Sequence, residues 1–185
     1  MPRRLVATAP HVIEVEEYSS SPVGANDVRI RTEFASGKHG TAQSLFEKVN
    51  FKGQVFEQEM RYFQTADDGV GWGAFSGPML LGTTGVGIVE EVGKGVRRVK
   101  VGDRVVGILK IASENVVDAD HVWLLGDADP LESLCIEPAY VSIHAVREAD
   151  VRFGETVAIF GLGAIGLIAV QIGRASCRER VCHRV

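Results

Sequence analysis

The sequence predicts a small, strongly curved β-domain that is followed by the beginning of an α/β domain. Over residues 1–107, short apolar/polar alternations are separated by turn-rich segments, which is typical of half-exposed strands. Closely spaced glycines inside these strands permit bends and bulges. After residue 129 the period becomes helical, and the helices lead into a short apolar run of the kind found in buried parallel strands.

Composition limits the chain to one core and the start of a second domain, since it has 185 residues, of which 45% are hydrophobic. The net charge of −4 and the scattered basic residues argue against a nucleic-acid partner. No apolar run resembles a signal peptide or a membrane span, so we expect a cytoplasmic protein without a membrane partner. The three cysteines form no CxxC or CxxH pattern, and we expect reduced thiols.

The first half of the chain contains the predicted strands. Residues 12–16 and 28–31 alternate and are expected in one antiparallel, half-exposed sheet. Residues 37–48 have helical potential, whereas residues 49–79 have little periodicity and several glycines and are expected to form a long surface loop. Residues 85–107 again combine strands with a glycine turn.

The second half contains the predicted helices. Pro130 suits a first helical turn, and Pro138 suits the start of a helix over 139–148. Its apolar stripe is expected at Tyr140, Ile143, Ala145 and Val146. Residues 156–160 then form the apolar run expected as a buried parallel strand.

A glycine-rich turn follows that run directly. Residues 161–166 read Gly-Leu-Gly-Ala-Ile-Gly and precede an apolar helix over 167–172, which is the strand, motif and helix order of a dinucleotide site. Gly161 would permit the tight turn, Gly163 would let a pyrophosphate approach, and Gly166 would allow close helix packing. Ala164 and Ile165 complete the cofactor-binding set at the helix N-terminus, where NAD or NADP is expected. The structural alternative is a glycine-rich turn in some other βα unit.

Residues 174–185 do not continue this pattern. Four arginines and two cysteines occur in twelve residues, where a second apolar strand and a ribose-binding acid are expected. The chain therefore offers one parallel strand where a doubly wound sheet needs several. We expect a truncated protein in which residues 174–185 are a foreign, exposed tail.

The order of motifs resembles the medium-chain dehydrogenase/reductase superfamily, in its zinc-type alcohol, sorbitol and threonine dehydrogenase branch. The resemblance covers about residues 1–173, and its most specific pieces are residues 81–93, 101–105, Glu137-Pro138 with His144-Ala145, and the turn at 161–166. It implies a GroES-like domain over 1–150 with the substrate and catalytic residues, and the start of a Rossmann domain over 151–173. The parent protein would be a homo-oligomer.

The resemblance also implies a metal site, which this chain alters. His39 occupies the position of the family's cysteine ligand, Thr83 replaces its histidine ligand, and Glu137 matches the later acidic ligand. A catalytic zinc needs three good protein ligands, and a neutral hydroxyl is a poor one. We expect a zinc-free or altered site.

Each of these residues has a simpler reading. His39 could be a polar loop residue, and Glu137 a carboxylate favoured by the helix dipole beside Pro138. His144 lies within the apolar stripe, so we expect a packed histidine rather than a ligand.

The resemblance implies an NAD(P)-dependent oxidoreductase that acts on an alcohol, a carbonyl or an activated alkene. Thr41 is the family-matched hydroxyl for a proton relay, and His39 is suited to acid/base exchange because imidazole has an unperturbed pKa of about 6.5. The alternative is a non-catalytic cofactor-binding or interaction protein that kept the fold, with this short chain itself inactive.

Overall fold

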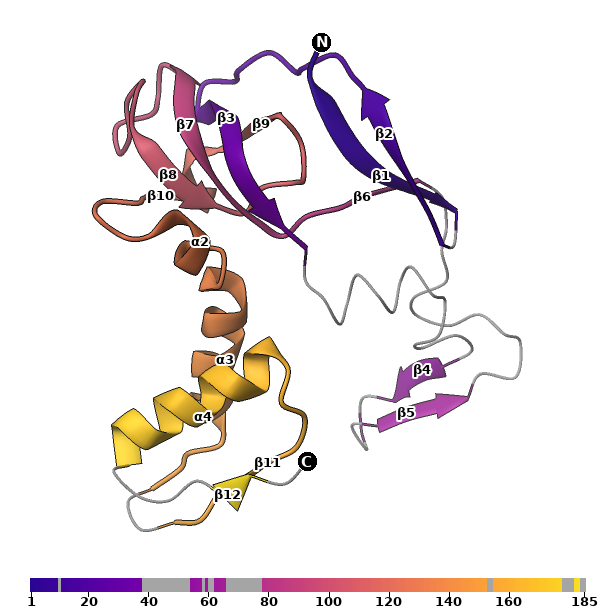
Figure 1. Ribbon diagram of the computed structural model, residues 1–185, viewed down its shortest axis with the longest axis vertical. Helices are drawn as coiled ribbons and strands as arrows, with labels where there is room; N and C mark the ends of the chain where they lie inside the picture. Colours follow the sequence, from indigo (N-terminus) through magenta and orange to yellow (C-terminus); the bar gives the residue numbers. More distant parts are fainter. Residues whose placement is uncertain are drawn as a thin grey trace. The chain divides into compact units, whose positions relative to one another are not determined.

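The computed structural model describes residues 1–9, 11–37, 54–57, 59, 62–65, 78–152, 155–177 and 182–183. The chain separates into two compact units, Met1–Gly126 and Asp127–Val185 (Figure 1). The first unit is built of β-strands, and the second combines helices with two short parallel strands. The predicted order of a β-rich region followed by an α/β region is confirmed. The division between units lies earlier than residue 150, so the functional boundary at 150 stays a prediction.

A five-stranded antiparallel sheet forms the centre of the first unit. Its order is β10 (Val122–Leu124), β8 (Arg104–Gly107), β7 (Thr84–Val92), β3 (Asp27–Ser36) and β9 (Glu114–Asp118). A short 3-10 helix, Ala119–His121, connects β9 to β10. The pairing of β3 with β7 shifts register twice, which bends the sheet as the interior glycines predicted.

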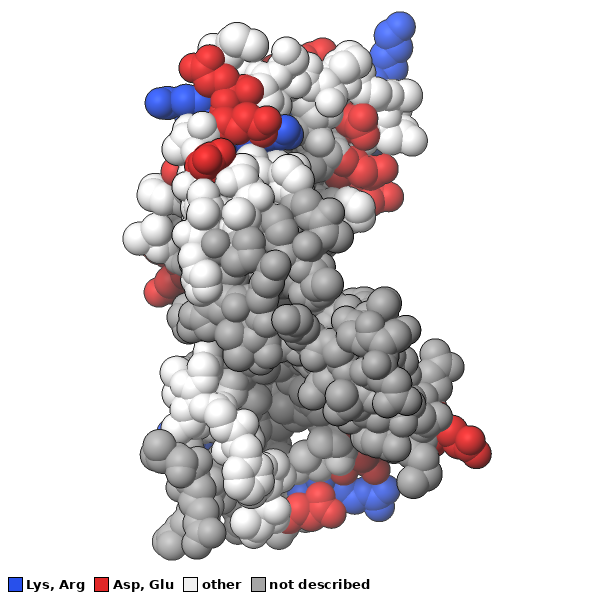
Figure 2. Space-filling model, turned by 90° about the vertical axis from the view of Figure 1, so that its right-hand side faces the viewer, with Lys and Arg blue, Asp and Glu red and all other residues white. Residues whose placement is uncertain are grey.

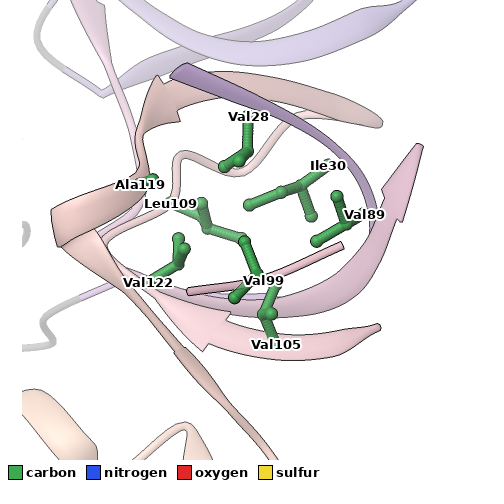
Figure 3. Close-up of a cluster of buried hydrophobic side chains, with 8 residues drawn as sticks. All are labelled: Val28, Ile30, Val89, Val99, Val105, Leu109, Ala119 and Val122. Carbon is green, nitrogen blue, oxygen red and sulfur yellow. The ribbon is translucent and has the colours of Figure 1, made fainter. Parts of the chain in front are cut away.

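The core lies on one face of this sheet. Figure 3 shows the side chains of Val28 and Ile30 pointing into it from β3, together with Leu109 from a connecting segment. Both β3 residues are fully buried, as is Leu109. Burying each such side chain contributes about 1.5–3 kcal/mol. The full cluster is Val28, Ile30, Val89, Val99, Val105, Leu109, Ala119 and Val122.

Gly87 lets β7 approach β3 closely. An added Cβ there would lie 2.3 Å from the backbone oxygen of Arg31 and 2.7 Å from Cγ2 of Ile30. Both distances are shorter than any real Cβ contact, so a side chain cannot be accommodated without moving the neighbouring strand. The glycine therefore keeps the two longest strands of the sheet in register over the core.

A second sheet in the first unit has the order β2 (Val12–Glu17), β1 (Arg3–Ala9) and β6 (Met79–Leu80). Residues 12–16 and 28–31 thus lie in different sheets, and the expectation of one sheet was wrong. All six residues of β2 are exposed. The alternation of β2 encodes a strand but carries no information about which strand pairs with it, because pairing is decided by distant residues.

The predicted loop at 49–79 is wrong in part. Within it, β4 (Gln54–Glu57) pairs antiparallel with β5 (Tyr62–Thr65), and Met79 begins β6. These strands are short and rich in aromatic and β-branched residues, which favour strands, but four residues are too few for a clear period. The helical potential of residues 37–48 falls outside the described residues, apart from Gly37.

Arg29 connects three segments of the first unit. Its Nε donates to Oε2 of Glu91 at 2.9 Å, and its Nη1 donates to Glu114 and to Oγ of Ser20. Its Nη2 donates to the backbone oxygen of Ser21 at 3.1 Å. The guanidinium is largely buried, with 18% of the side chain exposed, so it joins β3, β7 and β9 to the segment that follows β2. These hydrogen bonds to charged groups are stronger than neutral ones.

Tyr18 extends this network to the second sheet. Its hydroxyl donates to the backbone oxygen of Glu114, and the guanidinium of Arg4 lies 4.8 Å from its ring centroid. Burial and the charge of Glu114 raise the pKa of the Tyr18 hydroxyl, so it keeps the proton that it donates. Nε of Arg4 also donates to Glu16 on β2 at 2.7 Å. The Arg29 network, defined as Arg29, Tyr18, Ser20, Glu91 and Glu114, thus ties the two sheets together.

The second unit begins with two helices. In α2 (Pro130–Ser133), Oδ1 of Asp129 accepts from Leu131 N at 2.8 Å and from Glu132 N at 3.0 Å, and Pro130 occupies the first turn as predicted. The next helix, α3 (Ile136–Glu148), begins before the predicted residue 139. Pro138 is tolerated in its first turn because N–H groups there have no helical partner.

The buried face of α3 differs from the predicted stripe. Tyr140 is 72% exposed and Ile143 is 47% exposed, whereas Ser142 is fully buried. His144 is exposed, so the expectation of a packed histidine was wrong. The helical period identified the helix, but the face that is buried depends on where the later helix α4 (Ala164–Cys177) packs.

The second unit ends in a βαβ arrangement. The strand β11 (Ala158–Ile159) pairs in parallel with β12 (Cys182–His183), and α4 (Ala164–Cys177) connects them. The expectation of a single parallel strand was therefore wrong, and α4 runs into the predicted tail. Ala158 and Phe160 are exposed, so residues 156–160 do not form a buried strand. Two short strands with one covering helix leave much of their surface uncovered.

None of the described helices has the length and apolar character needed to cross a bilayer.

The pH dependence of stability tests the Arg29 network. Burial alone would raise the pKa of Glu114, but hydrogen bonds from Ser20 and Arg29 and the charge of Arg29 outweigh it, so this pKa is lowered. The stabilisation is present above the unfolded pKa of about 4.3 and is lost as the pH falls through the lower folded pKa. We expect Glu114→Gln to reduce the free energy of unfolding near pH 7 by about 1–2 kcal/mol and to flatten its acid decline, measured by urea unfolding.

The control is Glu90→Gln, which removes an exposed carboxylate paired with Arg31 at 3.0 Å on the same sheet. Exposed pairs contribute about 0–1 kcal/mol, so this variant should keep the acid decline of the wild type. Identical pH profiles for Glu114→Gln and wild type would show that the network does not contribute to stability.

Candidate functional site

The predicted site residues fall into three groups. Gly161, Gly163, Ala164, Ile165, Gly166 and Glu137 lie in the second unit, and Thr83 lies in the first. His39 and Thr41 fall outside the described residues. The glycine turn can therefore be built from the structure, while the two predicted catalytic residues stay predictions.

The turn at Gly161 joins β11 to α4. Gly161 has φ of +91°, in the left-handed region that favours glycine. The N–H of Leu167 donates to the backbone oxygen of Gly163 at 2.9 Å, which closes the first turn of α4. The N–H groups of Ala164, Ile165 and Gly166 therefore stand at the open end of the helix, where an α-helix leaves its first donors without helical partners.

Gly163 and Gly166 have opposite surroundings. Beyond its chain neighbours, no atom of the described residues lies within 4 Å of a Cβ added at Gly163, whereas a Cβ at Gly166 would lie 1.9 Å from the backbone oxygen of Gly161 and 3.6 Å from Cγ2 of Ile159. The turn thus closes tightly on Gly166 and leaves space outside Gly163. Free N–H groups and the partial positive charge of a helix N-terminus favour an anionic group, such as a phosphate, in that space.

Glu137 lies in the first turn of α3 and is half-buried, with its Oε2 atom buried. A carboxylate at this end of a helix is stabilised by the helix dipole. This position suits a carboxylate that binds a metal ion as well as a carboxylate that only stabilises the end of the helix. Among the described residues, no three His, Cys, Asp or Glu side chains come together as a metal site.

Thr83 lies just before β7 and is held by the sheet. Its backbone N–H donates to the oxygen of Ser36 at 2.9 Å, and its neighbour Thr84 is almost fully buried at the start of β7. The segment is therefore positioned by the pairing of β7 with β3. It brings a neutral hydroxyl to the position where the family resemblance expects an imidazole, and a hydroxyl is a weaker zinc ligand than an imidazole.

Ser142 is a residue that the sequence analysis did not select. It is fully buried on α3, and its Oγ lies 2.7 Å from the oxygen of Pro138 and 2.8 Å from the oxygen of Ile165. A serine among apolar residues of a helix was the available signal. The sequence could not show that its partner lies 23 residues further along the chain, in the first turn of α4.

Cys135, the N-cap residue of α3, carries a free, exposed thiol.

A cavity of about 300 Å³ in the first unit is lined by residues 95–98 and 118–120 together with Asn26. None of the predicted site residues lines that cavity. Figure 2 shows acidic and basic side chains next to one another on the described part of one face, without a continuous basic area.

Comparisons with known proteins agree with this architecture. The family model of the alcohol dehydrogenase GroES-like domain matches residues 24–126. D-guloside 3-dehydrogenase of Escherichia coli (strain K12) is 34% identical over 177 residues, which cover 93% of this chain and 51% of that protein. The chain thus spans about half the length of this curated relative.

Solved structures share the fold at lower identity. A dehydrogenase from Sinorhizobium meliloti 1021 bound to NADP has a TM-score of 0.74 and 21% identity, and the match covers 99% of this chain and 56% of that one. An alcohol dehydrogenase from Escherichia coli CFT073 in complex with NADH has a TM-score of 0.72 and 18% identity, with 98% and 56% covered. The match in each case runs through both units.

The contrast between the two glycines gives a test of the turn. We expect Gly166→Ala to lower stability by about 1–3 kcal/mol, because its Cβ has no space against Gly161. Gly163→Ala should leave stability unchanged within about 0.5 kcal/mol, since its Cβ meets open space. Thermal unfolding followed by circular dichroism measures both. Equal stability of the two variants would contradict the geometry of this turn.

Proposed function

Because the chain belongs to the medium-chain dehydrogenase/reductase superfamily and carries its alcohol dehydrogenase GroES-like domain, we propose that it acts as an NAD(P)-dependent oxidoreductase. The observation that carries the proposal is the open glycine turn at the N-terminus of α4, directly after a parallel strand. In this proposal residues 1–150 supply the substrate and catalytic side. Residues 151–173 begin the dinucleotide-binding domain.

The glycine turn would hold the cofactor pyrophosphate. The space outside Gly163 would take the phosphates, and the N–H groups of Ala164, Ile165 and Gly166 would donate to them, while Gly161 shapes the turn. NAD or NADP, when bound, supplies a nicotinamide that accepts or gives a hydride. The structures of similar fold that contain NADP or NADH support this cofactor class.

Thr41 and His39 are proposed as the proton-handling residues. During alcohol oxidation, the Thr41 hydroxyl would accept the substrate proton and pass its own proton to the imidazole of His39, and carbonyl reduction would reverse this path. This route needs no metal ion. We propose a zinc-free or altered site, supported by the threonine at position 83 and the donor chemistry of the remaining residues.

A small molecule with a hydroxyl or carbonyl group is the proposed substrate, in a parent protein that forms a cytoplasmic homo-oligomer. The Escherichia coli relative is named for the dehydrogenation of a D-guloside, which supports a sugar-like or polyol alcohol. The same residues would also suit the reduction of an activated alkene, because polarising a conjugated carbonyl by Thr41 and His39 requires no deprotonated alcohol.

A non-catalytic nucleotide-binding or interaction protein is the second candidate. The observation in its favour is the pair Thr83-Thr84, because Thr84 is buried in the sheet and neither residue can replace an imidazole or a carboxylate. The two candidates differ in turnover. Reduction of NAD or NADP in the presence of polyols supports the enzyme, whereas cofactor binding without any turnover supports the second candidate.

Gly163→Ala separates cofactor binding from folding. The added methyl group would occupy the proposed phosphate space without disturbing the protein, so we expect the Kd for NADH or NADPH to rise at least about tenfold at unchanged stability. Calorimetric titration measures the affinity. Affinity equal to that of the wild type would place the phosphates elsewhere, and no binding to the wild type would overturn the proposed cofactor role.

The metal content tests the zinc-free proposal. We expect clearly less than one zinc per chain after dialysis, since a neutral hydroxyl stands at position 83. Elemental analysis measures this ratio, with Glu137→Ala and His39→Ala as comparison variants. One tightly held zinc that is lost in both variants would restore a zinc-dependent mechanism.

A further inference from the structure

We infer that Ser142 is a positioning residue for the glycine turn, because its hydroxyl ties the first turn of α4 to α3. The two helices pack against each other within the second unit. Ser142 is fully buried between them, and its Oγ lies 2.8 Å from the backbone oxygen of Ile165. An effect of this contact on nucleotide binding rests on the proposed function, whereas the contact between the two helices rests only on the geometry.

The hydroxyl of Ser142 has one proton and two acceptors. The oxygens of Pro138, at 2.7 Å, and of Ile165, at 2.8 Å, both lie within hydrogen-bond distance. In an α-helix each of these oxygens already accepts an N–H from four residues further along. The single proton is shared between the two oxygens, so the bond to Ile165 is part of a three-centre hydrogen bond. This bond joins two helices, and its removal leaves both helical ladders intact.

Ile165 lies between Ala164 and Gly166, whose N–H groups form the open end of α4. Fixing the Ile165 oxygen fixes the rotation of this first turn about the helix axis, and with it the direction of those N–H groups. Gly166 is already pressed against Gly161 on the strand side. Ser142 holds the turn from the α3 side, so the donors are oriented before a ligand arrives, which lowers the cost of binding.

Hydrogen exchange of the 185-residue protein tests this inference. We expect the amides of residues 167–169, which donate within the first turns of α4, to exchange about fivefold faster in Ser142→Ala, as loss of one hydrogen bond predicts. Ser142→Cys keeps a side chain of similar size with a much weaker donor, and it should also exchange faster. Wild-type exchange in Ser142→Cys would mean that side-chain volume holds the turn, and it would overturn the inference.

Ser133→Ala is the matched control. The Oγ of Ser133 makes the same bond within its helix, to the oxygen of Asp129 at 2.7 Å, and lies in the same unit. Its removal should leave exchange at 167–169 unchanged. Equal exchange in Ser142→Ala and wild type, or an equal increase in Ser133→Ala, would also overturn the role of Ser142.

NADH titration separates this inference from the proposed function. If the protein binds NADH, Ser142→Ala should raise its Kd about fivefold while circular dichroism shows a folded protein, and Ser133→Ala should leave the Kd unchanged. Absence of NADH binding by every form, with faster exchange confined to the Ser142 variants, would overturn the proposed cofactor role and support the positioning role. An unchanged Kd in Ser142→Ala would contradict the orientation of the donors by Ser142.

Discussion

The close approach of Gly166 to Gly161 is the contact on which the candidate site depends. An added Cβ would lie 1.9 Å from the Gly161 oxygen, so only glycine lets α4 start immediately beside the strand. That position presents the helix N–H groups at the end of β11, where parallel strands of α/β domains place their ligands. Ser142 fixes the same turn from the other side through Ile165. The turn is thus restrained by one steric contact and one hydrogen bond.

A similar steric constraint acts in the first unit at Gly87. Its close contact with Arg31 holds β7 against β3, and this pairing encloses the core around Ile30. The same pairing fixes the start of β7, where Thr83 follows Gly82. The Arg29 network then joins the sheet to the segment after β2. Position 83 therefore directly precedes the central strand of the sheet, and its backbone is held by the hydrogen bond to Ser36 on β3.

The proposed chemistry differs from zinc catalysis in how charge is stabilised. A zinc ion would stabilise an alkoxide directly, whereas hydroxyl and imidazole groups transfer a proton as the hydride moves. In the proposed function Thr41 and His39 would supply those groups, while the carboxylate of Glu137 lies in the first turn of α3, where the helix dipole favours it. The proposed function thus treats cofactor binding at the glycine turn separately from metal binding, for which the threonine hydroxyl at position 83 would be a weak ligand.

The sequence by itself determined those features that depend on the chemistry of neighbouring residues. Pro130 after Asp129 specified a helix start, alternation specified strands, and the Gly-x-Gly-x-x-Gly spacing specified a turn between strand and helix. Only the tertiary structure decided which strands share a sheet, that residues 54–57 pair with residues 62–65, and that Ser142 rather than Tyr140 is buried. Periodicity records which residues of one element share a face. It contains no information about which distant element covers that face, because this depends on contacts between residues far apart in the chain.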